Sequence, residues 1–205
     1  MMPKLSILLA MKNIIEKAEY GTVFVASDFA EISENAKIGV SLSRLEEEGI
    51  IRRVLHGVYY KPEYSSFLCE YIVPSADNVA HAIARNFGWT IVPCGDTALN
   101  LLGLSTQVPA VWLYVSDGAY KEYSYDKTVI RFKRTTNKEI SKLSYKTALV
   151  VQAIKAIGKE KITYEDISRI TKQLSAVEKD KMLVEAKAVT SWVYEIIKDI
   201  CRGNK

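Results

Sequence analysis

The stretch between residues 27 and 62 constrains the fold of this chain more than any other feature of its sequence. It opens with a short helical pattern for which Ser27 is a suitable N-cap, and a polar turn leads into a longer helical pattern. The longer pattern places apolar residues at i, i+4 and i+7, on one face of a helix: Ile38, Leu42 and Leu45. Gly49, which adopts positive φ at no steric cost, is expected to end this helix.

Two β-like runs follow Gly49, at residues 50–54 and 58–61, and Pro62 stops the second run. Helix, turn, helix and a basic two-stranded hairpin is the order of elements in a winged helix-turn-helix. We therefore predict that residues 1–62 form a winged helix-turn-helix DNA-binding domain.

The longer helix carries hydrogen-bond donors opposite its apolar face, at spacings of 4 and 3: Lys37, Ser41 and Arg44. Such side chains reach phosphates or base edges when a helix enters a major groove. The hairpin adds candidates for contact with the phosphate backbone or the minor groove: Arg52, Arg53, His56 and Lys61. We predict that all of these residues contact double-stranded DNA.

A second interpretation of the same stretch stays open, because small helical domains with a hairpin also dock proteins. The acidic run Glu46–Glu48 would lie badly against phosphate unless it points away from the DNA. Under this alternative the winged helix is a protein-interaction module that docks a protein partner rather than DNA.

The remainder of the chain indicates a second domain, and the whole is expected to be an α+β protein. Residues 63–76 are aromatic and irregular, which favours a bridge between domains. Residues 77–205 are expected to form a C-terminal mixed α/β domain that ends in helices. The strongest strand pattern lies at residues 110–116, and residues 128–134 are expected to return antiparallel to it.

The net charge of +4 is distributed unevenly along the chain. Residues 1–62 hold 8 basic and 8 acidic side chains, whereas residues 131–205 hold 17 basic and 9 acidic ones. The C-terminal excess suggests a second surface for nucleic acid or an acidic partner, and a solvated lysine-rich helical face explains it equally well. The candidates for that surface are Arg131, Lys133, Arg134, Lys138 and Lys142.

The spacing of cysteine and histidine argues against a metal site, a disulfide framework and a catalytic centre. The three cysteines are far apart without a CxxC pair, and neither histidine lies near one of them in sequence. Cys94 lies on a tight turn between Pro93 and Gly95, but no neighbouring base would activate its thiol. We therefore predict no cofactor, no metal ion and no enzymatic activity.

No apolar run approaches the roughly 20 residues that cross a bilayer. The apolar N-terminal segment is short and continues into a charged helical pattern, which is atypical of a signal peptide. The sequence thus predicts a cytoplasmic protein that makes no membrane contact.

Three segments resemble a known family: VPCGDTALNLLGLSTQVPAVWLYVSDG at 92–118, NKEISKLSYKTALVVQAIKAIGK at 137–159 and GVYYKP at 57–62. The chain is similar to AbiE-type antitoxins of type IV toxin–antitoxin, or abortive-infection, modules, and in particular to a compact branch known as a domain of unknown function. The resemblance implies a transcriptional regulator whose winged helix binds operator repeats upstream of its own operon. It also implies a C-terminal domain that counteracts a nucleotidyltransferase-like toxin, typically without a stable complex. The matching winged-helix positions are Lys37, Ser41, Arg44, Arg52 and Arg53.

Overall fold

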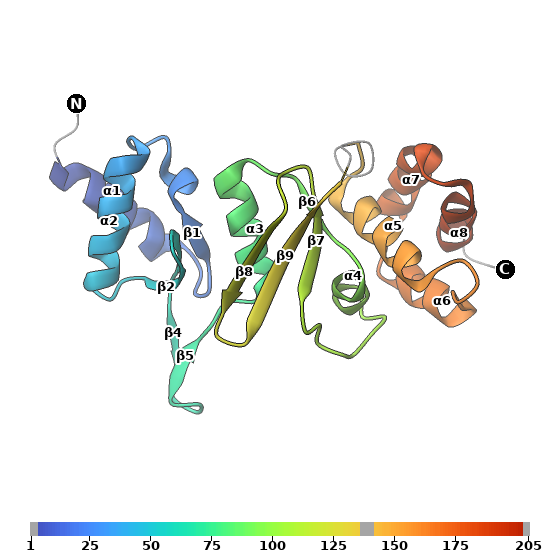
Figure 1. Cartoon of the computed structure of the whole chain (residues 1–205), viewed down its shortest axis with the longest axis horizontal. Coiled ribbons are helices and arrows are strands. Elements are labelled where there is room, and N and C mark those ends of the chain that lie inside the picture. Colours follow the sequence, from blue (N-terminus) through green and yellow to red (C-terminus); the bar gives the residue numbers. More distant parts are fainter. Residues whose placement is uncertain (1–3, 136–141, 203–205) are drawn as a thin grey trace. The chain divides into compact units, whose positions relative to one another are not determined.

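The computed structural model describes residues 4–135 and 142–202 and has a mixed α+β fold, as predicted (Figure 1). Within the described residues there are eight α-helices and three small sheets. The chain divides into two compact units, Met1–Trp89 and Thr90–Lys205. Each unit has its own strands and its own buried core.

The first unit begins with two α-helices and a three-stranded sheet. Its first elements in chain order are α1 (Lys4–Lys17), β1 (Val23–Val25), the 3-10 helix η1 (Ala26–Phe29), α2 (Asn35–Glu47), β2 (Arg52–Leu55) and β3 (Val58–Tyr60). The sheet is antiparallel in the order β1-β3-β2, so Tyr60 lies opposite both Val23 and Arg52. Gly57, with φ of +77°, occupies the turn between β2 and β3, where a side chain would strain the backbone.

The core of this region lies between α1, α2 and the sheet. Ile38, Leu42 and Leu45 of α2 are at most 1% exposed, which confirms the apolar face predicted from their spacing. They cluster with buried residues of α1, the sheet and the connecting segments: Ile7, Met11, Ile15, Phe24, Phe29, Ile51 and Tyr59. Burying each such side chain contributes about 1.5–3 kcal/mol. The inner face of α2 is therefore fixed, and only its opposite face is accessible.

The segment after β1 differs from the prediction, because its helix begins before Ser27. η1 starts at Ala26 with Val25 as its N-cap residue, so Ser27 lies inside the first turn. The Ser27 hydroxyl oxygen is buried, and it has no hydrogen-bond partner in the described part of the chain. The N–H of Val25 donates to the Asp28 carboxylate at 2.9 Å, so Asp28 and not Ser27 supplies a side-chain acceptor at this helix start.

A second hairpin follows β3, where the sequence analysis predicted an irregular bridge. β4 (Glu63–Ser65) and β5 (Glu70–Ile72) pair antiparallel, and Figure 1 shows them as a narrow ribbon extending from the first unit. Tyr64 lies opposite Tyr71 and their ring centroids are 5.2 Å apart. The hairpin therefore packs chiefly against itself.

α3 (Ala76–Phe87) belongs to the first unit, although the sequence analysis assigned it to the second domain. Ser75 caps its start by accepting the N–H of Asn78, and Gly88 ends it with φ of +67°. The helix packs against β1 and η1. The first unit thus extends to Trp89 and not to residue 62.

The second unit combines a sheet with a helical end. Its elements in chain order are β6 (Ile91–Pro93), α4 (Asp96–Leu101), β7 (Trp112–Ser116), β8 (Lys121–Tyr125), β9 (Thr128–Arg134), α5 (Tyr145–Ile157), α6 (Tyr164–Lys172), α7 (Ala176–Glu185), the 3-10 helix η3 (Ala186–Ala188) and α8 (Ser191–Arg202). The helices share a core in which Val150, Ile154 and Ile197 are fully buried. None of the helices in the described ranges is long and apolar enough to cross a membrane.

The path from β7 to β9 differs from the predicted direct antiparallel return. The sheet order is β6-β7-β9-β8, and β8 pairs antiparallel with β9. Because the chain reverses twice, β9 runs parallel to β7, with Trp112 opposite Ile130. β8 alternates polar and aromatic residues and is half exposed, so its apolar signal in the sequence is weak.

Candidate nucleic-acid interface

The outer face of α2 is where the sequence analysis predicted base contacts. Arg44 is exposed there and has no ion-pair partner among the described residues. Lys37 is partly exposed, and its Nζ lies 3.4 Å from the carboxylate of Glu34 in an exposed pair that stabilises little. Val40 lies between these two cations and is 57% exposed. The accessible face of α2 therefore contains Lys37, Val40 and Arg44.

Ser41 contributes little exposed surface to this face, although its spacing places it with Lys37 and Arg44. The residue is 8% exposed, and its Oγ donates to the carbonyl oxygen of Lys37 at 3.0 Å. Ser41 comes three residues after Ile38 and four before Leu45, one helical turn from each, so it lies at the edge of the buried face. Its donor is already used within the helix.

A hollow of about 280 Å³ lies beside Val40. Its wall combines one residue of α1 with five residues from α2: Ile7, Ala36, Lys37, Val40, Ser41 and Arg44. Three of these residues, Ile7, Ala36 and Val40, are apolar, and Lys37 and Arg44 add two positive charges.

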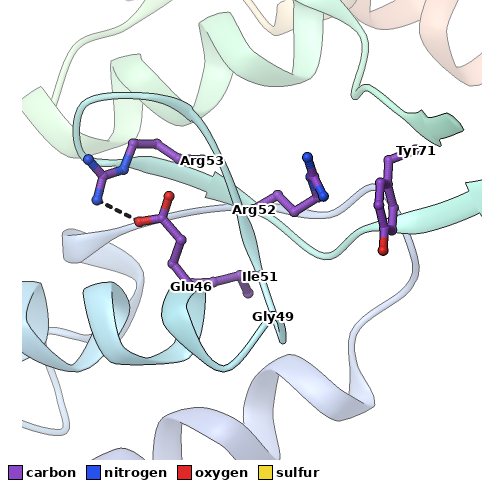
Figure 2. A pocket seen from close by; sticks show the side chains of 6 residues that line it. All are labelled: Glu46, Gly49, Ile51, Arg52, Arg53 and Tyr71. Atoms are coloured by element: carbon purple, nitrogen blue, oxygen red, sulfur yellow. Dashed lines mark hydrogen bonds and ion pairs between the residues drawn. The ribbon is translucent and has the colours of Figure 1, made fainter.

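The two arginines of β2 point in different directions, as Figure 2 shows. Arg53 donates to Glu46 of α2 with 2.5 Å between Nη2 and Oε2, and its guanidinium lies 5.3 Å from the ring centroid of Tyr59. Burial would lower the pKa of Arg53, but Tyr59 and Glu46 together raise it above its ordinary value. Arg53 is therefore a permanent cation whose charge is largely met inside the unit.

Arg52 is exposed and stacks on a residue of the second hairpin. Its guanidinium carbon lies 4.2 Å from the ring centroid of Tyr71, a cation–π contact. A second hollow of about 250 Å³ separates the two arginines, with walls made by Glu46, Gly49, Ile51, Arg52, Arg53 and Tyr71 (Figure 2). Both arginines are exposed to solvent, but Arg53 is paired with Glu46, whereas Arg52 has no acidic partner among the described residues.

The acidic run that argued against DNA is partly neutralised inside the unit. Glu46 pairs with Arg53, and the Glu48 carboxylate lies 3.8 Å from Nζ of Lys12 on α1. Glu47 is exposed between them. Two of the three carboxylates are thus engaged with cations of neighbouring elements.

Lys61, which is predicted to contact DNA, makes several contacts inside the first unit. Its Nζ donates to the carbonyl oxygens of Glu16 at 2.7 Å and Ala18 at 2.8 Å. It also lies 4.8 Å from the ring centroid of Tyr20. A cation on the last carbonyls of a helix satisfies acceptors that the helix leaves free and opposes its dipole. Of the predicted hairpin contacts, His56 remains exposed beside the turn at Gly57.

The predicted second basic surface is only partly assembled. Lys133 and Arg134 are exposed at the end of β9, and Lys142 is exposed before α5. Arg131 instead donates from Nε to Glu122 on β8 at 2.6 Å, and this hydrogen bond raises its pKa. Lys138 lies outside the described residues.

A family model matches residues 10–182 of the chain, which is most of its length. The protein belongs to the family of unknown function DUF6088. The match includes α2, both hairpins and the sheet of the second unit. A comparison with curated proteins found no match.

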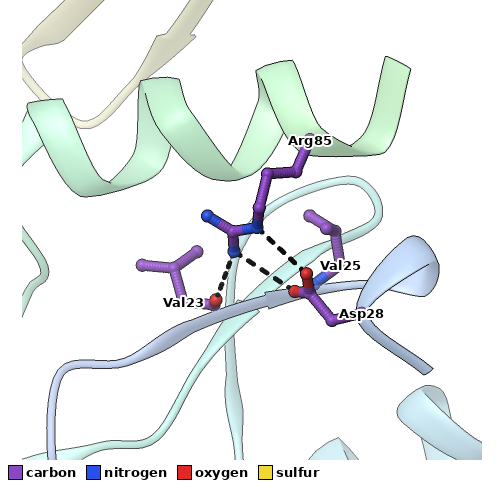
Figure 3. A network of polar contacts seen from close by, with 4 residues as sticks. All are labelled: Val23, Val25, Asp28 and Arg85. Carbon is purple, nitrogen blue, oxygen red and sulfur yellow. Dashed lines mark hydrogen bonds and ion pairs between the residues drawn. The ribbon is translucent and has the colours of Figure 1, made fainter. Parts of the chain in front are cut away.

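Sequence reasoning missed one polar network within the DUF6088 match, which Figure 3 shows. Arg85 of α3 donates to Asp28 from Nε at 3.0 Å and from Nη2 at 3.2 Å. The same Nη2 donates to the carbonyl oxygen of Val23 at 3.1 Å. Because Asp28 also accepts the N–H of Val25, this carboxylate joins α3, β1 and η1. Arg85 and Asp28 are 57 residues apart, so no local pattern could have paired them.

The buried cysteine of this DUF6088 chain, Cys94, has an unreactive thiol. Burial raises the pKa of Cys94 to about 11, although the charge of Lys133 lowers it somewhat. Its side chain is therefore a neutral thiol near pH 7 and a poor nucleophile. Among the described residues, no group of three or more His, Cys, Asp or Glu side chains could hold a metal ion.

Proposed function

We propose that the first unit is a winged helix-turn-helix that binds double-stranded DNA. The observation that supports this most is the element order α1-β1-η1-α2-β2-β3 combined with the sheet order β1-β3-β2. In a winged helix the second helix of the motif enters the major groove, and the hairpin lies along the adjacent backbone. Here those elements are α2 and the β2–β3 hairpin.

The exposed charges of these two elements suit that role. Arg44 and Lys37 lie on the accessible face of α2, and Arg52 and His56 are exposed on the hairpin. Arg53, Ser41 and Lys61 make internal contacts, so they act on DNA only through the positions of α2 and the hairpin. This leaves a small set of contacts, consistent with a single module that binds a short half-site.

We further propose that the protein regulates its own operon and counteracts a nucleotidyltransferase-like toxin encoded beside it. The support is the resemblance of residues 92–118 and 137–159 to AbiE-type antitoxins, together with the winged helix proposed above. In this view the winged helix binds operator repeats, and the second unit provides the antitoxin activity without a stable complex.

DNA binding is tested with the full-length protein and the DNA upstream of its own gene. We expect preference over shuffled DNA and an affinity that falls with salt, with a log–log slope of roughly −0.9 per phosphate contact. Equal affinity for upstream and shuffled DNA would contradict the regulator role. The antitoxin role is tested by expressing the neighbouring gene with and without this chain: growth arrest that this chain does not relieve would contradict it.

A second candidate function, protein docking, is favoured by the β4–β5 hairpin. Its tip exposes Phe67 at 93% and Leu68 at 56%, and both strands carry acidic residues, Glu63 and Glu70. No Lys or Arg occurs between Pro62 and Arg85, so this hairpin does not suit a phosphate backbone. Exposed apolar groups concentrated in this way are typical of protein contacts. A stable complex with the purified neighbouring gene product, lost on Phe67→Ser, would support this candidate over indirect antitoxicity.

A further inference from the structure

α2 exposes one large apolar side chain on a helix that buries all its others. Ile38, Leu42 and Leu45 are fully buried, whereas Val40 is 57% exposed. Val40 does not stand alone, because Ile7 and Ala36 extend its apolar surface along the hollow of about 280 Å³. The accessible face of α2 thus contains an apolar recess formed by several residues, of which Val40 is one.

Two cations flank this recess on the same helix face. Lys37 precedes Val40 by three residues and Arg44 follows it by four, the spacings at which helical side chains are neighbours. The surface is therefore apolar at its centre and positive at its edges. Its complement is an apolar group surrounded by negative charge. The C5-methyl group of thymine in a major groove is such a group, since phosphates line both sides of the groove.

We infer that Val40 and Arg44 read two nearby bases of the operator. Val40 contacts the C5-methyl group of a thymine, and Arg44 donates to O6 and N7 of a guanine. This inference rests on the proposed function, and it names the bases that the winged helix reads. Val40 and Arg44 are separated by about 6 Å along the helix axis, and successive bases by roughly 3.4 Å. The thymine and the guanine therefore lie within about two base pairs of each other.

The neighbouring residues leave few other candidates on α2. The Ser41 hydroxyl already donates to Lys37 within the helix. Lys37 makes a weak exposed pair with Glu34 and has the shape of a phosphate contact, because ammonium groups bind as point charges. Arg44 combines exposure, a guanidinium with no ion-pair partner in the described part of the chain, and a fork geometry that matches guanine. Val40 and Arg44 thus carry the base specificity of this face.

The test begins with full-length protein and a random-sequence duplex library, from which the preferred sites are selected. We expect an enriched site that contains guanine and thymine within about two base pairs. Fluorescence anisotropy then compares this site with one in which that thymine is replaced by uracil, which lacks the methyl group. The wild type should bind the uracil site about three- to fivefold more weakly, the effect of one buried methyl group.

Two variants assign the effect to residues. Val40→Ala should bind the thymine and uracil sites equally, and it should keep its fold because alanine favours an exposed helix position. Arg44→Ala should lose about tenfold or more in affinity and most of the preference for guanine over 7-deazaguanine. The matched control is Val177→Ala in α7, where valine is 77% exposed, and it should retain the full difference between thymine and uracil.

The outcomes separate this inference from the proposed function. An enriched site that the wild type binds equally with thymine or uracil overturns the inference and leaves DNA binding intact. A full thymine preference in Val40→Ala overturns the role of Val40. If the recess instead docks a protein, Val40→Ala leaves every DNA affinity unchanged, which also overturns it. A library without any enriched sequence removes the proposed function itself.

Discussion

The two hairpins of the first unit follow each other in the chain but are built in opposite ways. β3, the inner strand of the β2–β3 hairpin, is at most 5% exposed at Val58, Tyr59 and Tyr60. The β4–β5 hairpin exposes its strands and its tip, and Phe67 is almost fully accessible. The first hairpin is therefore positioned by the core. The second is held by its own strand pairing and by the contact of Tyr71 with Arg52.

Their charges differ as well as their burial. The first hairpin presents Arg52 and His56 to solvent, while the second carries Glu63 and Glu70 and no basic residue. A rigid cationic hairpin suits phosphate, which has a fixed geometry, whereas an exposed acidic and apolar hairpin suits a protein surface. We therefore propose that the same local structure serves two kinds of contact, depending on what packs behind it. Variants of each hairpin measure this difference directly.

The largest effect is expected from Tyr59→Ala in the buried strand. Removing this ring leaves a cavity between α2 and the sheet, and the free energy of unfolding should fall by about 3 kcal/mol. Urea denaturation of the full chain, followed by circular dichroism, measures it. The matched control is Tyr64→Ala in the second hairpin, where tyrosine is 56% exposed and a change below about 1 kcal/mol is expected. Equal losses in the two variants would show that both hairpins are built into the core.

Local sequence patterns were sufficient to predict α2, because the spacing of Ile38, Leu42 and Leu45 fixes its inner face. They did not predict that Ser41 is buried. This residue lies at the edge of the apolar face, where neighbouring helix positions differ between buried and exposed. Val40 lies on the same helix, but an exposed valine gives no signal in the sequence until its neighbours are known. Contacts between residues distant in sequence leave no local pattern, so they could not be predicted from the sequence. Lys61 finds acceptors 43 and 45 residues away, and Arg85 finds Asp28 57 residues away.

Lys61→Ala is expected to cost less than the loss of Tyr59. The variant removes the cation that satisfies the last carbonyls of α1, and a destabilisation of about 1–1.5 kcal/mol should follow. Because Lys61 is engaged internally, the salt slope of DNA binding should stay as in the wild type. If the log–log salt slope became shallower by the amount expected for one phosphate contact, Lys61 would be a residue that contacts DNA.

Arg85→Ala tests whether α3 is an integral part of the unit that carries both hairpins. The variant leaves Asp28 with one fewer donor and frees the carbonyl of Val23, and about 1 kcal/mol of stability should be lost because Arg85 is 48% exposed. Arg169→Ala in α6 is a fair control, since its pair with Glu165 is a local one and Arg169 is 49% exposed. That control should lose about 0.3–0.5 kcal/mol. If the two variants were equivalent, the Arg85 network would add nothing beyond an ordinary surface pair.

The smallest effect is expected from Phe67→Ser at the tip of the second hairpin. Phe67 is 93% exposed, so its removal should change the free energy of unfolding by less than about 0.5 kcal/mol, within the range of ordinary surface substitutions. The affinity for DNA should be unchanged as well, because the hairpin around it is acidic. Phe29→Ser, at a residue only 1% exposed, supplies the contrast and should destabilise the unit strongly. A loss above about 1 kcal/mol in Phe67→Ser would mean that the tip is covered in solution. The two hairpins would then differ in what covers them and not in whether they are covered.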